Sequence, residues 1–304
     1  MEIDTRFPTR LNVVSDAPEP LRSALQETIQ SQESIRFLVH APAFTAADGR
    51  SPATVLALTN DGWLVASETE NGGAVVEKSD FSDTLYLELK SILLFGQLKI
   101  FFAAADASSS AIIKFETVGD YHYREAIELM LAGIDPALTA VLEKDRSEVS
   151  TFEDWPMKVR NEAQRFWPQG QRFVAAIQWP AVFDESQQQI TPEGALLVTE
   201  RELVLISEEK QPSAEPAPEA PLEAEPKEKV GGIITFVPRV RLADFQVSHQ
   251  EQIDVLTLQV RAAHGGDKLE IGFSFEDENA VSKAMEKMLP SRISAPQAVN
   301  ENLM

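Results

Sequence analysis

Apolar and polar side chains alternate with a period of two in several stretches of the chain, as Leu85 to Lys90 shows. This period places alternate side chains on opposite faces of a strand, with one face buried and the other in water. The arrangement is typical of antiparallel sheets. The predicted strands lie at 35–40, 54–59, 63–68, 85–90, 98–102, 239–242, 256–261 and 269–275.

Other stretches repeat apolar residues every three or four positions, which is the spacing of a helix with one buried face. Two of these helices follow prolines, which are tolerated in a first helical turn. Asp120 and Asn279 are the expected N-caps of two more. Asp135-Pro136 is expected to start a further short helix. The predicted helices lie at 21–29, 123–131, 137–142, 159–167 and 281–288.

The same order of elements occurs twice. Arg36 to about Leu131 corresponds to Arg172 to Leu289, and the matching hairpins begin at Thr59 and Thr199. The second turn, Glu200-Arg201-Glu202, lacks the glycine of Asn60-Asp61-Gly62, where we expect a positive φ. A repeat of this length is two whole domains rather than a set of short solenoid units. The predicted domains are 16–143 and 150–290, with flexible termini at 1–15 and 291–304.

The second copy is longer than the first. Most of the surplus lies in Gln211–Glu228, a Pro/Ala/Glu run with five prolines. Such a composition buries little apolar surface and stays disordered or extended. We predict a disordered insertion at about 209–230, either a tolerated loop or a flexible contact recognised in an extended form. The segment between the domains is expected at about 144–155.

Several short strands, a lead-in helix, a closing helix and the hairpins Thr59 to Val65 and Thr199 to Val204 resemble the bacterial PH-like (pleckstrin-homology-like or GRAM-like) superfamily, in tandem. The resemblance covers roughly 20–135 and 155–290. It implies an α+β, mainly β chain of two PH-like domains. Each would be an antiparallel split barrel with a lead-in helix and a C-terminal helix. One fold hosts many roles, so the resemblance implies no single function.

The loops that would bind phosphoinositides depart from that family. In PH domains that bind these lipids, the loop between the first two strands carries several basic residues. Here the first-copy loop, 44–51, has one arginine, and the second-copy loop, 183–189, has two acids and no base. The resemblance therefore carries over no site for an anionic headgroup.

Composition narrows the function classes. The 304 residues carry a formal net charge of −21, which disfavours nucleic acid and anionic membranes as direct partners. There is no cysteine, so disulfides, thiolate nucleophiles and cysteine-based zinc sites are excluded. Met1 to Arg6 carries acids and is followed by no apolar run of the kind found in a signal peptide. We expect a cytoplasmic protein.

Isolated candidates for chemistry have simpler structural explanations. The four histidines are far apart in sequence and form no metal-ligand spacing. Asp120 with His122 suggests acid–base chemistry but is explained by a helix cap, and Glu276-Asp277-Glu278 is explained by a helix N-terminus. The tryptophans are expected in cores, with Trp155 and Trp167 at the interface between the copies. The glycine pairs 72–73, 231–232 and 265–266 are expected in turns.

These patterns favour a non-enzymatic cytosolic interaction or scaffold module, with no catalytic residue, cofactor or metal assigned. We expect a protein partner, favoured electrostatically if its surface is basic, bound at an exposed strand edge or in the interdomain groove. A lipid- or small-ligand-binding protein that uses a barrel end or that groove is the alternative. An enzyme with carboxylate chemistry at the domain interface is the third hypothesis.

Overall fold

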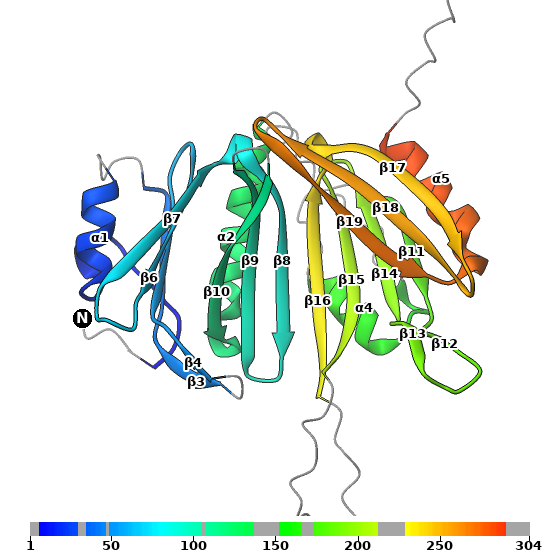
Figure 1. Ribbon diagram of the computed structural model, residues 1–304, viewed down its shortest axis with the longest axis horizontal. Helices are drawn as coiled ribbons and strands as arrows, with labels where there is room; N and C mark the ends of the chain where they lie inside the picture. Colours follow the sequence, from blue (N-terminus) through cyan, green and yellow to red (C-terminus); the bar gives the residue numbers. More distant parts are fainter. Residues whose placement is uncertain are drawn as a thin grey trace, which may run out of the picture.

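The computed structural model describes residues 6–29, 35–46, 49–104, 107–136, 152–165, 173–211 and 229–289. This part of the chain is mainly antiparallel β-structure, with sheets that remain open and four α-helices packed against them (Figure 1). The mainly β, α+β class predicted from the alternating patterns is therefore confirmed.

The first copy runs from a lead-in helix to a closing helix. Its first sheet has the order β1-β2-β5-β6-β7 and its second contains β8, β9 and β10. The elements are β1 (Thr9–Arg10), η1 (Val14–Asp16), α1 (Leu21–Thr28), β2 (Phe37–Ala41), β3 (Phe44–Ala46), β4 (Gly49–Ser51), β5 (Thr54–Leu58), β6 (Gly62–Glu68), β7 (Ala74–Asp80), η3 (Phe81–Asp83), β8 (Thr84–Ile92), β9 (Phe95–Ala104), β10 (Ala107–Glu116), η4 (Thr117–Gly119) and α2 (Asp120–Ile134).

The second copy repeats this series. Strands β11, β14, β15 and β16 correspond to β2, β5, β6 and β7, and a three-stranded sheet β17-β18-β19 corresponds to β8, β9 and β10. The elements are α4 (Met157–Arg165), β11 (Phe173–Trp179), β12 (Val182–Phe183), β13 (Gln189–Thr191), β14 (Gly194–Thr199), β15 (Glu202–Gln211), β16 (Lys229–Pro238), η6 (Arg239–Arg241), β17 (Leu242–Gln250), β18 (Ile253–Ala262), β19 (Gly265–Phe273), η7 (Phe275–Asp277) and α5 (Glu278–Met288).

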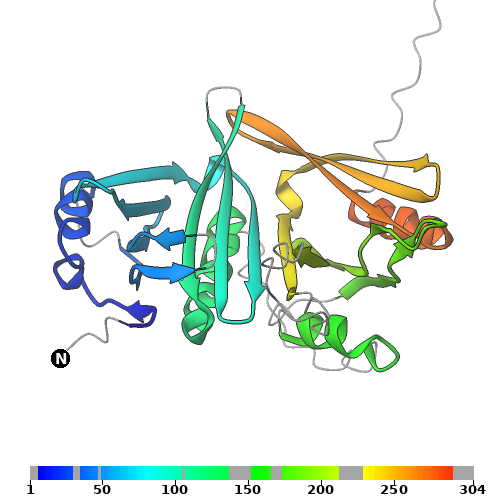
Figure 2. The ribbon, with the colours of Figure 1, turned by 60° about the horizontal axis from the view of Figure 1, so that its bottom comes forward.

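The two copies share one sheet. Strand β8 of the first copy pairs antiparallel with β16 of the second, and the resulting seven-stranded sheet has the order β10-β9-β8-β16-β15-β14-β11. Figure 1 shows this sheet crossing the middle of the molecule, with α2 and α4 behind it. In the turned view of Figure 2, β17, β18 and β19 lie across the opposite face. The pairing is head-to-tail, because the fifth main strand of one copy meets the fourth of the other.

Three apolar clusters hold the fold together, and two of them combine both copies. One joins Leu87 and Leu89 of β8 and helix α2 to the second copy's Ile234 and Phe236. Another, which contains α5, joins the first copy's Tyr86 to strands β14–β19. The third packs α1 against the outer face of the first sheet. Burial of apolar area at the joint therefore stabilises both copies at once.

Local expectations are confirmed where one element faces one core. Leu21 and Leu25 of α1 are buried, as are the predicted stripes of α2 and α5. Val159 and Ala163 of α4 are buried as well. The predicted short helix at 137–142, most of the segment at 144–155, the terminus 291–304 and residues 212–228 of the predicted insertion lie outside the described residues. The two ends of that predicted insertion, 209–211 and 229–230, are instead paired within β15 and β16.

The lead-in segment is better ordered than expected. Residues 6–15 belong to the stretch predicted as a flexible terminus, yet Thr9–Arg10 pairs with β2. Leu11 and Val14 are buried in the cluster beneath α1. The expectation fails because this apolar contact is made with a distant sheet, and the segment has no periodic pattern of its own.

Three other expectations are wrong in detail. Asp120 is the first residue of α2 and Gly119 is its N-cap, because a 3₁₀ turn precedes the helix. Asn279 lies inside α5, whose N-cap is Asp277. Residues 239–241 form the turn η6 instead of a strand, so only Leu242 continues into β17.

Candidate functional site

The joint between the copies combines a strand ladder, two apolar clusters and side-chain hydrogen bonds that cross from one copy to the other. In the ladder of β8 with β16, Leu87 faces Phe236 and Leu89 faces Ile234. Gly231 lies at the end of this ladder, where an added Cβ would come within 2.1 Å of Ile92 Cγ1. Glycine at this position therefore leaves room for the side chain of Ile92. The pair 231–232 was expected in a turn but lies within β16.

The start of β8 fills the corner of the second copy between β16 and β18. Leu85 and Tyr86 are buried there together with Val237 and Val260. The Tyr86 hydroxyl donates to Asp267 Oδ2 at 3.0 Å. Burial, followed by the charge of Asp267, raises the pKa of Tyr86 well above its usual range. Tyr86 was expected on a wet face, but the second copy covers that face of β8.

Arg241 of η6 ties the second copy to the corner turn of the first. Its Nε donates to the carbonyl of Thr84 at 2.9 Å, and an Nη donates to the carbonyl of Phe81 at 2.7 Å. Burial lowers the pKa of Arg241, while the charges of Asp83 and Asp135 oppose that shift. The guanidinium thus donates to two backbone carbonyls of the first copy at the point where the two copies meet.

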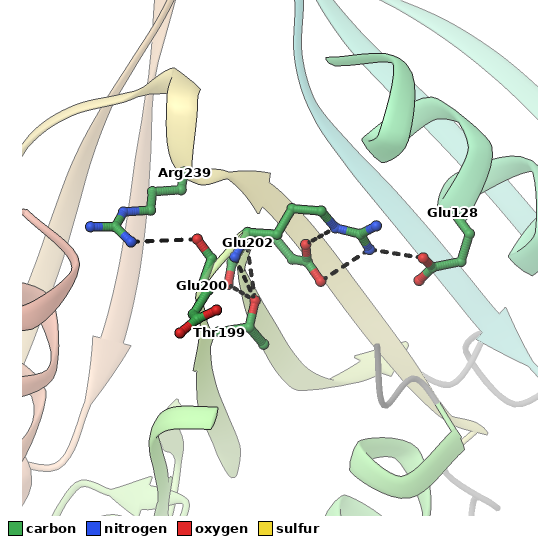
Figure 3. A network of polar contacts seen from close by, with 6 residues as sticks. Glu128, Thr199, Glu200, Glu202 and Arg239 are labelled. Atoms are coloured by element: carbon green, nitrogen blue, oxygen red, sulfur yellow. Dashed lines mark hydrogen bonds and ion pairs between the residues drawn. The ribbon is translucent and has the colours of Figure 1, made fainter. Parts of the chain in front are cut away.

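A second arginine network lies on the α2 side of the joint (Figure 3). Arg201 and Glu202 are adjacent in the β14–β15 hairpin, and both side chains are almost fully buried. Arg201 Nε pairs with Glu202 Oε2, and Arg201 Nη2 donates to Glu128 Oε2 of α2 at 2.8 Å. The hairpin of the second copy is thus bonded to the closing helix of the first.

The protonation of this network follows from burial and pairing. Burial disfavours the charge of Arg201, but hydrogen bonds and charges of Glu202 and Glu128 raise its pKa overall. Burial raises the pKa of Glu202, and Arg201 opposes that rise. The pair stays together because each charge is compensated where water is excluded. This buried acid therefore faces an arginine that also bonds the carboxylate of Glu128.

In each copy, a threonine at the corresponding position closes the hairpin turn: Thr59 in the first copy and Thr199 in the second. Thr199 Oγ1 accepts from the amides of Arg201 and Glu202 and donates to the Glu202 carbonyl at 2.9 Å. Thr59 Oγ1 makes the equivalent contacts with Asp61 and Gly62. The expectation of a positive φ in the turn Asn60-Asp61-Gly62 is wrong. The hydroxyl of Thr59 closes this turn instead.

Asp120 has a role other than helix capping. It is buried and pairs with Arg124 at 3.0 Å on its own helix and with Arg165 of α4. Burial lowers the pKa of Arg165. The carboxylate thereby joins α2 to the lead-in helix of the second copy, and no contact to His122 enters this network in the described structure.

In the second copy, the start of β8 fills a corner beside β16. The corresponding corner of the first copy, beside β7, contains a hollow. A space of about 760 Å³ lies between β7 and the end of β9, lined by Asp61, Asp80, Asp83, Lys78 and Phe102. Its floor includes Trp63, whose Nε1 donates to Thr84 Oγ1 at 2.9 Å. In the second copy, the corresponding place is where Leu85 and Tyr86 lie.

Among the strands that end a sheet, β7 and β17 correspond to the two strands that form the joint. Within the described residues, β7 pairs with β6 alone and β17 pairs with β18 alone. Figure 1 shows these strands towards opposite ends of the molecule. Strand β7 corresponds to β16, and β17 corresponds to β8; β16 and β8 pair with each other along these edges. An unpaired edge offers a row of backbone donors and acceptors to another strand.

The four histidines are distributed over separate sites. His40 is buried in β2 and its pKa is lowered by desolvation, and burial also lowers the pKa of His122. His249 contacts Asp254 at 2.9 Å, and His264 of the second copy contacts Asp83 of the first at 2.8 Å. In the described ranges no group of three or more histidine or acidic side chains is arranged to hold a metal ion.

The described tryptophans pack as core residues. Trp63 and Trp179 are buried, and Trp179 packs near Phe273. Trp155 contacts Phe152, with ring centroids 4.5 Å apart, against the cluster that combines both copies. That cluster is one of the two that combine both copies, which agrees with the predicted interface role of Trp155. Trp167 lies outside the described residues.

The acidic run at the start of α5 forms the turn η7 and the first helical turn. Ser274 caps η7 by accepting from the Glu276 amide. Burial, followed by the charge of Glu276, raises the pKa of Asp277. Acids at a helix N-terminus interact favourably with its dipole, so these residues fit a structural role.

No protein-family model matches the chain, and no curated protein sequence is significantly similar to it. Among the helices that the structure describes, none is long and apolar enough to cross a membrane.

Proposed function

We propose that the chain is a non-enzymatic cytosolic interaction or scaffold module made of two PH-like domains. The observation that carries this proposal is strand addition within the molecule itself, in which β8 of one copy extends the sheet of the other. Strand addition is a general mode of peptide recognition, in which backbone bonds give affinity and side-chain pockets give selectivity. The unpaired edges of β7 and β17 offer the same chemistry to another protein.

The repeated order of elements supports the PH-like reading of each copy. In both, four main strands precede a short turn, three more strands follow, and a helix closes the series. The lead-in helices α1 and α4 pack on corresponding sheets. The two copies thus resemble each other in the succession and pairing of their strands.

The proposal is tested by identifying a partner and reconstituting the complex from purified components. The tagged full chain captures candidates from the native cytosol, and each purified candidate is then measured by calorimetry. We expect a purified protein to bind and to slow amide hydrogen exchange at an unpaired strand edge. A parallel variant lacking Gln211–Glu228 separates binding by the insertion from binding by the folded surfaces.

The hollow beside β7 favours one alternative, a small-ligand site at a barrel end. Its volume of about 760 Å³ lies in the range of ligand pockets. Three aspartates in the lining disfavour an anionic ligand such as a phospholipid headgroup. Flotation with anionic vesicles is expected to leave the protein unbound. Stoichiometric binding to vesicles, without any protein partner, would replace the proposed function with this alternative.

A further inference from the structure

Building on the proposed function, we propose that the edge of β7 and the adjoining hollow bind an extended segment of another protein that carries basic residues. The segment adds as a strand antiparallel to β7 and places lysine or arginine in the hollow. In the second copy, the corresponding edge and corner are already filled by β8.

The correspondence between the two edges follows from the ladders. Gly62 faces Asp80 at the start of the β6–β7 ladder, and Glu202 faces Pro238 at the start of β15–β16. Counting along each strand from these pairs matches Val76 with Ile234 and Lys78 with Phe236. Ile234 and Phe236 are the residues that meet β8 in the second copy.

The backbone of β7 is oriented for such an addition. The Phe81 amide donates to the Asp61 carbonyl at 2.8 Å, just beyond the last pair of the ladder. Bonded and non-bonded pairs alternate in an antiparallel ladder. The amides and carbonyls of Val76 and Lys78 therefore point away from β6, towards the unpaired side. Those of Ser79 and Glu77 bond to β6.

The charges around the two corners differ in a consistent way. Arg241, which binds carbonyls of the incoming β8, corresponds to Asp83 in the first copy. Arg201, which binds Glu128, corresponds to Asp61. Both aspartates line the hollow, together with Asp80 and Lys78, and Asp83 also contacts His264 of the second copy. In the second copy, the two arginines bind backbone carbonyls and an acid. The aspartates at the corresponding positions of the first copy favour a cationic group instead.

The same comparison disfavours a second copy of this chain as the occupant. Its β17 would lie against β7, and its α5 would take the place that α2 holds at the internal joint. Glu286 of α5 corresponds to Glu128, so it would face Asp61 where Glu128 faces Arg201. Two carboxylates replace an ion pair, and the net charge of −21 adds long-range repulsion.

The test uses a phage-displayed library of random nine-residue peptides, selected against the full chain. Two protein variants differ only in the edge amide: Lys78→Pro removes the outward N–H, and Lys78→Ala removes the side chain alone. Proline is tolerated on an edge strand where its nitrogen faces outward. Circular dichroism and tryptophan fluorescence check that both variants keep the native fold.

We expect enriched peptides that alternate β-branched or aromatic residues with lysine or arginine. Their affinity should fall about tenfold in Lys78→Pro, the effect of about one lost hydrogen bond, and stay near wild type in Lys78→Ala. It should also fall in Asp61→Asn and with added salt. Selected peptides without basic residues, or equal binding to Lys78→Pro and Lys78→Ala, would overturn the inference.

The remaining outcomes separate this inference from the proposed function. Peptides that lose affinity in Val247→Pro, on β17, and keep it in Lys78→Pro would leave protein binding intact but move the site. Concentration-dependent self-association, abolished by Lys78→Pro in sedimentation velocity, would make a second copy the occupant and overturn the basic segment. Recovery of no peptide would overturn the edge as a binding site, while calorimetry with a purified partner decides the proposed function independently.

Discussion

Removing Arg201 tests whether the buried network at the joint stabilises both copies. The Arg201 side chain is 3% exposed and that of Glu202 is 0% exposed, so solvent screens neither charge. Arg201→Ala leaves Glu202 buried without its cation. Breaking a buried ion pair from one side costs about 3–5 kcal/mol. We expect the free energy of unfolding to fall by that amount.

The pH dependence of this loss distinguishes an uncompensated charge from lost packing. Burial raises the pKa of Glu202 in the folded chain, so folding favours its protonated form at low pH. The stability linked to that proton declines as pH rises from the ordinary carboxyl range through the folded pKa. Without Arg201 the pKa of Glu202 rises further, because Arg201 opposes the effect of burial. The deficit of Arg201→Ala should therefore be smaller at pH 5 than at pH 8.

Urea denaturation, followed by tryptophan fluorescence and circular dichroism, measures the effect. Glu128→Gln is the matched control, because the Glu128 side chain is 46% exposed and its pairing should contribute less than about 1 kcal/mol. The double variant Arg201→Met with Glu202→Leu should recover most of the loss, since it removes both charges. A loss of less than about 1 kcal/mol at pH 8, or a loss that does not depend on pH, would show that Glu202 is not left as an uncompensated buried charge.

Two further predictions concern the backbone at the joint and a buried imidazole. Gly231→Val should lower the free energy of unfolding by about 1–3 kcal/mol through overpacking, whereas Gly232→Val, with nothing within 4 Å of its Cβ position, should change it far less in the same urea titration. His40 has a pKa lowered by burial, so its contribution is complete above the ordinary histidine pKa and is lost as pH falls through the folded value. His40→Leu should therefore flatten the decline of stability below about pH 6.5, measured by thermal unfolding across pH.

Features fixed by local periodicity could be predicted from the sequence, because a helix or strand that faces one core shows its burial in its own spacing. Leu21 and Leu25 of α1 are an example, and Met285 of α5 is another. Tyr86 fails the same test, because β8 is covered on both sides. Leu11 fails too, because its partner strand lies far along the chain.

The joint could not be derived from periodicity, since pairing of β8 with β16 depends on which edges meet in space. Residues of the joint can nevertheless be recognised when the sequences of the two copies are compared, because their charge differs between the copies. Arg201 stands where the first copy has Asp61, and Arg241 stands where it has Asp83. A charge that reverses between two copies of one domain marks a position whose surroundings differ. Periodicity does not register such a difference, because both residues are polar.

The head-to-tail joint also explains why the two copies need different edges. A heterologous contact leaves one complementary edge unused on each side, and identical copies would continue the pairing into open chains. Here β7 and β17 are those unused edges. Unprotected edges invite aggregation, and charged residues at the edge oppose it. We expect the acids at Asp61, Asp80 and Asp83 to limit strand addition to a basic partner and to keep the chain from extending itself. Replacing all three with asparagine should therefore produce self-association detectable by sedimentation velocity. A triple variant that stays monomeric at the highest concentrations reached would show that charge is not what prevents the pairing.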